Sequence, residues 1–310
     1  MKSLRMLVVI SLAIVVLGSL MVSGTGIAAS KKILLGYSVQ DLGNQFWVTV
    51  AEGIKSRAKE LGADVIVLDA RTDPAKQLAQ VEDLLQRKID VLLLSPWDSD
   101  SGGTCVQAAN RKNVPVVVVD VGVNTGKIET LIVSDNFKGG EMAGEYVAKL
   151  LGGKGKAVHI QCQLGYKIPK LRGDGFTEVM KKYGIKIVGR QPADSQRSLG
   201  MTVMQNMLQA HPDIDAVFAE NDEMALGALE AIKAARKQGQ VKVVGFDAIP
   251  DALKSIKDGG LAGTVAQQPY EMGRMGVDAA MKVLKGEKLP EVIYAPVKLV
   301  TPENVDQFLK

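Results

Sequence analysis

The sequence predicts an α/β protein with two doubly wound, parallel-sheet lobes. Short apolar runs rich in Val and Ile recur along the chain without alternating with polar residues, which is typical of strands buried on both faces of a parallel sheet. Segments of helical length, with charged and apolar residues mixed, separate these runs. At 310 residues the chain is long enough for about two domains, and a single sheet holding all of these runs would be unusually wide.

The elements follow one another as alternating strands and helices. The expected strands are residues 33–39, 65–68, 91–94, 116–119, 157–160, 216–218 and 243–246. The expected helices include residues 46–61, 74–87, 139–151, 171–183, 222–237 and 269–285. Asp73 and Pro74 form a helix start signal, and glycines directly after three of the helices are stop signals. This alternation predicts βαβ units with right-handed crossovers.

The order of the segments predicts two similar lobes. The helix that ends at Leu151 leads through a glycine-rich stretch, residues 152–155, into a second series of strands and helices. The last helix and residues 293–297 follow that series, so we expect the chain to return to the first lobe. Cys105 and Cys162 then fall in different lobes, and we expect two buried or partly buried free thiols rather than a disulfide.

The composition excludes several classes of protein. Hydrophobic residues make up 46% of the chain and charged residues 23%, which are values of a globular protein and not of a disordered or fibrous one. The formal net charge is +4, and no segment has the dense Lys and Arg content typical of nucleic-acid-binding proteins. We therefore expect no nucleic-acid partner.

The amino-terminal segment, residues 1–29, has the pattern of a secretory signal peptide. A basic start is followed by an apolar run without charges, residues 7–22, and then by small residues. The alternative is a retained membrane anchor, because the run approaches the roughly 17–25 residues of a spanning helix. We expect export to the periplasm with cleavage near Ala28 or Ala29. No Cys follows the run, so the lipid-attachment motif of many surface-tethered proteins is missing.

Polar and aromatic side chains gather where the predicted strands end. Ligands of open α/β sheets bind beyond these carboxyl ends. The residues found there are Gln40, Asn44, Phe46, Trp47, Ser95, Trp97, Asp120, Arg172, Asn221, Phe246, Asp247 and Gln267. Flat rings, amides, carboxylates and one Arg suit a small polyhydroxylated ligand, because rings stack on C–H faces and each hydroxyl needs a donor or acceptor. Asp120 and Asp247 end their runs at matching places in the two halves, which favours a ligand role for both.

Several of these residues have a simpler structural explanation. Asn44 and Asn221 are equally typical of turns. Phe46 and Trp47 open a helix and could pack inward. Arg172, taken alone, is more typical of a solvated helix face.

Catalytic motifs are missing. The sequence has no G-x-x-x-x-G-K-[ST] loop, no H-E-x-x-H motif and no G-x-S-x-G motif. The two histidines, His159 and His211, fall in a predicted strand and a predicted turn, so they form no metal or catalytic set. We expect no enzymatic activity, no metal and no cofactor.

At these residues the sequence resembles the periplasmic ribose-binding protein family, the smaller type I substrate-binding proteins of ABC sugar importers. The resemblance covers nearly the whole chain after residue 29. Its most specific stretches are Leu68-Asp69, residues 73–78, Ser95-Pro96, residues 98–100, residues 133–136, residues 191–194, residues 203–208, residues 219–229 and residues 244–247.

The resemblance implies a fold and a set of ligand contacts. The family has two α/β lobes joined by three crossings, which fall here near Ser134-Asp135, Gln267-Gln268 and Pro296-Val297. The lobes would comprise residues 30–134 plus 268–296 and residues 135–267 plus 297–310. The sugar contacts carry over to Asn44, Phe46, Trp47, Asp120, Arg172, Asn221, Phe246, Asp247 and Gln267. The two Asp residues and Arg172 would bind ring hydroxyls, and the aromatic rings would stack on the two faces of the sugar.

Four positions depart from the ribose-binding pattern. Val121 stands where ribose-binding members have an Arg. Gln40, Ser95 and Ser195 stand where they have Ser, Asn and Phe. Because a site built to pair a hydroxyl rejects ligands that leave its groups unpaired, these changes keep the class of small sugars but leave the identity of the sugar open.

The expected function is therefore that of an exported, non-enzymatic receptor that delivers a monosaccharide to a membrane ABC permease. Ribose, another pentose, a deoxyhexose, a polyol or another hydroxylated signal molecule are the candidate ligands. We expect a monomer, and the sequence leaves open a chemoreceptor as second partner. Two remote alternatives are a sugar-acting enzyme and a regulator core. The regulator would need an amino-terminal helix-turn-helix, where this chain has an apolar leader.

Overall fold

The computed structural model describes residues 32–164 and 167–309. The predicted signal peptide and its cleavage site near Ala28 or Ala29 lie outside these ranges. The fold below is that of the unit beginning at Ile33. No helix in the two ranges combines the length and hydropathy that a membrane span requires.

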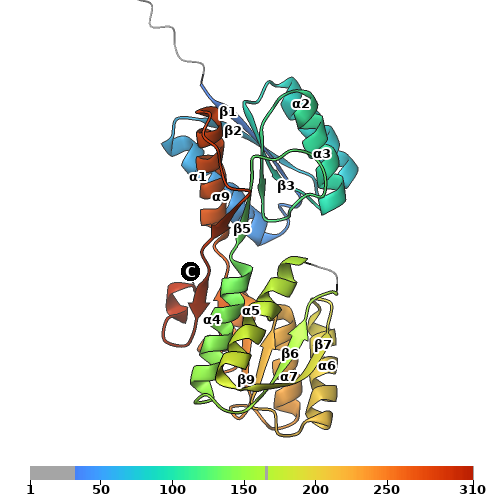
Figure 1. The fold of residues 1–310 in the computed structure, drawn as a ribbon, viewed down its shortest axis with the longest axis vertical. Helices are drawn as coiled ribbons and strands as arrows, with labels where there is room; N and C mark the ends of the chain where they lie inside the picture. Colours follow the sequence, from blue (N-terminus) through green and yellow to red (C-terminus); the bar gives the residue numbers. More distant parts are fainter. Residues whose placement is uncertain (1–31, 165–166, 310) are drawn as a thin grey trace, which may run out of the picture. The chain divides into compact units, whose positions relative to one another are not determined.

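The strands of the described residues form two six-stranded sheets with the same strand order. Figure 1 shows the strands gathered into two separate sheets with helices around each. The first sheet has the order β11-β5-β4-β3-β1-β2 and contains β1 (Leu34–Val39), β2 (Asp64–Asp69), β3 (Val91–Ser95), β4 (Val116–Val119), β5 (Thr130–Ser134) and β11 (Val292–Ala295). The second sheet has the order β12-β10-β9-β8-β6-β7 and contains β6 (Lys156–Gln161), β7 (Lys186–Pro192), β8 (Ala216–Ala219), β9 (Lys242–Asp247), β10 (Gly263–Ala266) and β12 (Lys298–Val300). The predicted doubly wound architecture is confirmed.

The chain passes from one sheet to the other three times within this part. It crosses between β5 and α4 (Asn136–Leu150), between β10 and α9 (Pro269–Leu284), and between β11 and β12, which confirms the three crossings that the resemblance implied. The last crossing explains one departure from an all-parallel prediction. β12 enters the second sheet beside the carboxyl end of β10, with Lys298 opposite Ala266, so it must run back along β10 as an antiparallel edge strand.

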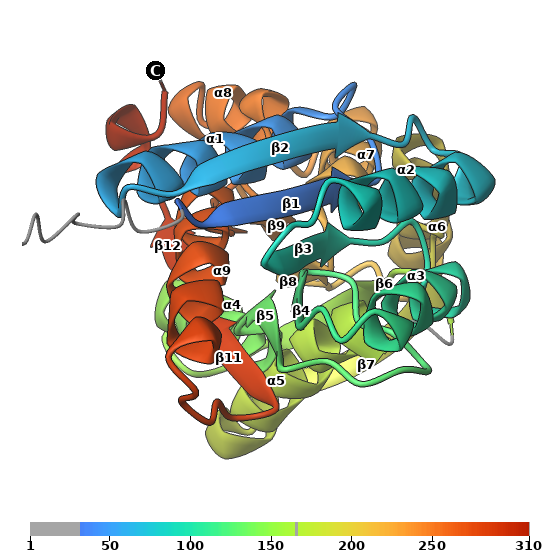
Figure 2. The same ribbon diagram turned by 90° about the horizontal axis from the view of Figure 1, so that it is seen from above.

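Helices cover both faces of each sheet (Figure 2). Around the first sheet lie α1 (Gln45–Glu60) and α9 (Pro269–Leu284) on one face, and α2 (Pro74–Gln86) and α3 (Ser99–Arg111) on the other. Around the second sheet lie α4 (Asn136–Leu150) and α5 (Lys167–Tyr183) on one face, and α6 (Arg197–Ala210), α7 (Asp222–Ala234) and α8 (Pro250–Lys257) on the other. A short 3-10 helix, Val305–Gln307, follows β12. We call each sheet with its helices the first and the second lobe.

The local signals in the sequence work as expected. Asp73 caps α2 by accepting hydrogen bonds from the amides of Ala75 and Lys76, with Pro74 in the first turn. The predicted glycine stops follow α1, α4 and α5 with positive φ, for example 72° at Gly62. Cys105 and Cys162 are both buried and free, as predicted.

Three helix pairs approach so closely that each helix carries a glycine at the contact. In the pair α1 and α9, a Cβ on Gly53 would overlap the carbonyl oxygen of Tyr270, and a Cβ on Gly273 would overlap that of Val50. Gly140 and Gly175 have this role between α4 and α5, and Gly200 and Gly227 between α6 and α7. Close contact between the backbones therefore fixes the relative positions of the two helices in each pair, and so the positions of the side chains that they carry.

We predict that Gly53→Ala lowers the free energy of unfolding by roughly 1–3 kcal/mol, since α1 and α9 must move apart to admit the methyl group. Denaturant unfolding measures this. Lys55→Ala, at an exposed position of the same helix, is the matched control and should change stability by less than about 0.5 kcal/mol. Equal stability of the two variants would contradict the close-contact account.

Candidate ligand-binding site

Arg172 is the centre of the candidate site, and it is buried. Its side chain lies on α5 and the residue is only 7% exposed, so the alternative of a solvated helix face is wrong. Its Nε donates to Asn136 Oδ1 (2.8 Å), and its Nη1 donates to the carbonyl oxygen of Glu220 (2.8 Å) and to Asp247 Oδ1 (3.2 Å). The guanidinium carbon lies 3.9 Å from the ring centroid of Phe246. The charge is thus held by hydrogen bonds, a carboxylate and an aromatic face.

Asp247 links this arginine to the second crossing. Its Oδ1 also accepts a hydrogen bond from Gln267 Nε2 (2.8 Å), and Gln267 Oε1 in turn accepts one from Ser134 Oγ (2.7 Å). Burial raises the pKa of Asp247, and the nearby Arg172 opposes this effect. The structure therefore brings three of the predicted residues, Arg172, Asp247 and Gln267, into one hydrogen-bonded group.

Asp120 is the counterpart of Asp247 in the first lobe. Asp120 directly follows β4 and Asp247 is the last residue of β9, in each case after four buried residues, and both have positive φ, 74° at Asp120 and 114° at Asp247. The Asp120 carboxylate forms no hydrogen bond with any residue that the structure describes. Burial raises its pKa to about 6, Arg172 opposes this through its positive charge, and Asp247 adds to it. A desolvated carboxylate without a donor therefore lies within electrostatic reach of Arg172 and Asp247.

The two predicted asparagines cap helices and keep a free amide group. Asn44 Oδ1 accepts from the amide of Phe46 at the start of α1, and Asn221 Oδ1 accepts from the amide of Met224 at the start of α7. Both asparagines therefore have a structural role as helix caps. This role occupies only the oxygen of each side chain, and neither Nδ2 group donates a hydrogen bond to the described residues. Capping and ligand binding are compatible at both positions.

The aromatic residues are less exposed than stacking on a sugar suggests. Trp47 is 6% exposed and packs in the core of the first lobe, as the inward-packing alternative stated. Phe46 is half-buried and meets Trp47 edge to face, with ring centroids 4.8 Å apart. Phe246 is fully buried under Arg172, and a Cβ on Gly139 would come within 2.6 Å of its ring. Of these three, Phe46 has the ring surface best able to meet a ligand.

The weaker candidates have mixed environments. Gln40 Nε2 donates to the carbonyl of Pro96 (3.2 Å), and the Ser95 hydroxyl shares a hydrogen bond with Tyr37 (2.9 Å); both residues are buried. Trp97, by contrast, is 43% exposed. Ser195 is exposed and has a φ of 61°, and it lies near the Cys162 thiol. Burial raises the pKa of that thiol to about 12, so it is not a reactive nucleophile.

The structure adds two buried polar residues that the predicted ligand contacts did not include. Asn136 begins α4 and holds Arg172, as described above. Asp222 accepts hydrogen bonds from Thr264 Oγ1 (2.7 Å) and the amide of Ile249 (3.0 Å), and so fixes the chain just after Asp247. Burial raises its pKa well above the ordinary value. Asn136 and Asp222 both lie in stretches that carry the resemblance, residues 133–136 and 219–229. The spacing of residues in the sequence, however, does not show that these two side chains are buried.

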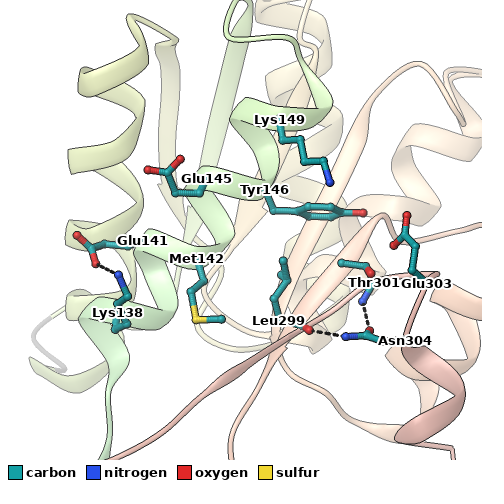
Figure 3. A pocket seen from close by; sticks show the side chains of 10 residues that line it. All are labelled: Lys138, Glu141, Met142, Glu145, Tyr146, Lys149, Leu299, Thr301, Glu303 and Asn304. Carbon is teal, nitrogen blue, oxygen red and sulfur yellow. Dashed lines mark hydrogen bonds and ion pairs between the residues drawn. The ribbon is translucent and has the colours of Figure 1, made fainter.

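A surface pocket is formed by a different set of residues (Figure 3). It has a volume of about 540 Å³, and α4 and the chain from β12 onward line it, with Tyr146, Leu299 and Asn304 among the side chains. None of the predicted site residues lines it. The described residues contain no cluster of His, Cys, Asp and Glu that could hold a metal ion.

Comparisons with known proteins identify the family. The family model described as a periplasmic binding protein domain matches residues 35–288. The chain is 46% identical over 271 residues to the ribose import binding protein RbsB of Bacillus subtilis, covering 87% of this chain and 88% of that protein. It is 43% identical over 275 residues to the protein of the same name in Escherichia coli, covering 89% and 93%.

A solved structure agrees with this result. The periplasmic ribose ABC transporter protein of Conexibacter woesei superposes with a TM-score of 0.85 at 28% identity, covering 90% of this chain and 95% of that one. The architecture, the sequence match and the grouping of Arg172, Asp247 and Gln267 lead to one conclusion. The chain belongs to the periplasmic binding protein family and is a homologue of the ribose import binding proteins.

Proposed function

We propose that the protein is the solute-binding component of an ABC sugar importer and binds ribose or a similar monosaccharide between the carboxyl ends of its two sheets. The Asp120 carboxylate is the observation that carries this proposal. It is desolvated enough for its pKa to rise to about 6, and it forms no hydrogen bond with the described residues. Asp120 is half-buried. A carboxylate that loses part of its hydration is costly unless other donors meet it, and the hydroxyls of a sugar are such donors.

The neighbouring groups supply the rest of a site for hydroxyls. Arg172 uses Nε and Nη1 within the protein, and its Nη2 forms no hydrogen bond with the described residues, so Nη2 is the edge that donates to the ligand. The Nδ2 groups of Asn44 in the first lobe and Asn221 in the second lobe are free to donate hydrogen bonds to the ligand. Asp247 Oδ2 forms no hydrogen bond with the described residues, so it accepts a hydrogen bond from a further ligand hydroxyl. Phe46 packs against an apolar face of the sugar.

Ribose is the first candidate ligand because the relatives named above are ribose import binding proteins. Val121 is the reason to test others. It follows Asp120 directly and packs against the core of the first lobe as a partly buried apolar side chain. The resemblance places an Arg at this position in ribose-binding members. One side chain that donates hydrogen bonds to the sugar hydroxyls in their site is therefore missing here. Another pentose, a deoxyhexose or a polyol is the alternative within the same class.

The remaining parts of the proposal follow from the family. We propose export with cleavage near Ala28 or Ala29, action as a monomer without enzymatic activity, and delivery of the sugar to a membrane permease. The lobes would comprise residues 30–134 plus 268–296 and residues 135–267 plus 297–310, closing on the ligand by bending at the three crossings. A chemoreceptor is a possible second partner.

We predict that Asp120→Ala and Arg172→Ala each weaken sugar binding by roughly 2–5 kcal/mol, because each leaves its partner charge or a ligand hydroxyl unpaired. Isothermal titration calorimetry with ribose and the alternative sugars measures the loss. Asp258→Ala is the control, since that carboxylate pairs with Lys254 on the surface of α8. Wild-type affinity in both site variants, with the fold intact, would disprove the site.

Affinity should also depend on pH through Asp120. The Asp120 carboxyl group has a pKa of about 6 in the free protein, and it must be ionised to accept hydrogen bonds from the sugar hydroxyls. Sugar binding therefore weakens as the pH falls below 6. The dissociation constant should be about tenfold higher at pH 5 than at pH 8. Asp120→Asn should flatten this profile. A wild-type profile that is already flat would show that Asp120 does not titrate with binding.

Stability of the ligand-free protein should change in the opposite direction. The folded-state pKa of Asp120 lies above the unfolded value, so the folded state holds the extra proton between about pH 4 and 6. The contribution of this group to the free energy of unfolding is therefore fully present below pH 4 and is lost as the pH rises through 6. Denaturant unfolding at several pH values measures the difference in free energy of unfolding between wild type and Asp120→Asn, and this difference isolates the contribution of Asp120. An unchanged difference across this range would contradict the raised pKa.

A further inference from the structure

Arg172 is part of a closed ring of hydrogen bonds that includes two residues outside the proposed ligand contacts. Asn136 Oδ1 accepts from Arg172 Nε (2.8 Å), and Asn136 Nδ2 donates to the carbonyl of Ser134 (2.8 Å). The Ser134 hydroxyl donates to Gln267, Gln267 donates to Asp247, and Arg172 donates to Asp247. The ring thus returns to Arg172.

Burial and hydrogen bonding fix the orientation of the Asn136 side chain. Asn136 is 2% exposed and Ser134 is 1% exposed, so water does not replace these bonds. Both ends of the Asn136 amide are used, one as acceptor and one as donor, which leaves a single orientation of the side chain. With Nε fixed by Asn136 and Nη1 fixed by the Glu220 carbonyl, the plane of the guanidinium group is set, and the Nη2 edge points one way.

The ring also connects the site to the crossings. Ser134 ends β5 and Asn136 begins α4, so both lie at the first crossing. Gln267 follows β10 at the second crossing. Two of the three connections between the lobes are therefore hydrogen-bonded to the charged groups proposed to hold the sugar.

We propose that Asn136 is a positioning residue for sugar binding: it does not touch the ligand, and it orients the Arg172 guanidinium group so that Nη2 meets a ligand hydroxyl. This inference rests on the proposed function. The competing explanation is that Asn136 only stabilises the fold at the first crossing, as a buried polar residue with two hydrogen bonds would in any protein.

Asn304 offers a matched control for that explanation. Its Oδ1 accepts from the amide of Thr301 (2.8 Å) and its Nδ2 donates to the carbonyl of Leu299 (3.0 Å). Like Asn136, it accepts through Oδ1 and donates from Nδ2 to a backbone carbonyl, but its acceptor bond is to a backbone amide and neither bond reaches Arg172. Replacing either asparagine by Ala should lower the melting temperature.

The test compares sugar affinity in Asn136→Ala, Asn304→Ala and wild type by calorimetry. We expect a dissociation constant 10- to 100-fold higher for Asn136→Ala and within about twofold of wild type for Asn304→Ala. In an Arg172→Ala background, Asn136→Ala should add less than about twofold, because the group that it orients is gone. If Asn136→Ala does not fold, Asn136→Ser replaces it. Its hydroxyl keeps a donor for the Ser134 carbonyl but is too short for Arg172, and the same loss is expected.

Two results would overturn the inference. One is wild-type affinity in the Asn136 variants while Arg172→Ala loses binding. The other is an effect of Asn136→Ala that remains in full in the Arg172→Ala background, since this is the behaviour of a purely structural residue. A wild-type protein that binds none of the sugars would instead reject the proposed function, and the inference with it.

Discussion

The buried guanidinium group of Arg172 is the constraint on which the site depends. A charge that is removed from water is stable only when hydrogen bonds and an opposite charge replace the water. Here the side chain of Asn136, the carbonyl of Glu220, the carboxylate of Asp247 and the ring of Phe246 do so together. Each of these groups lies at the end of a strand or the start of a helix. The position of one arginine thus determines the geometry of several loops.

The fold brings these loops together by repeating one topology. Both sheets have the same strand order and differ in the direction of one edge strand, so Asp120 after β4 and Asp247 at the end of β9 occupy equivalent places. Parallel strands put their carboxyl ends at one edge of the sheet, and the helices pack on the faces, which leaves that edge for polar residues. The glycine contacts between α4 and α5 bring the backbone of Arg172 against Gly140, so the arginine reaches the edge of the second sheet from a rigid helix.

Much of this could be predicted from the sequence, and the reasons for success and failure are physical. Strands buried on both faces, such as β3 with five buried residues, appear as continuous apolar runs. The expected strands did not include β7, because it is half exposed with mixed polar residues, or β10, because Gly263 and Thr264 interrupt its apolar run. The burial of Arg172 could not be predicted either, because it depends on the α4–α5 contact and on Asn136, which lie more than thirty residues away in the chain.

The central claim is that the unpaired carboxylate of Asp120 and the oriented edge of Arg172 form a sugar-binding site. The most direct measurement is calorimetric titration of ribose into the protein after unfolding and refolding have removed any ligand carried through purification. The account predicts saturable binding with one site per chain and a dissociation constant near 1 μM, or about −8 kcal/mol, for ribose or for one of the related sugars. No heat of binding with any of them, from a protein that has refolded, would contradict it.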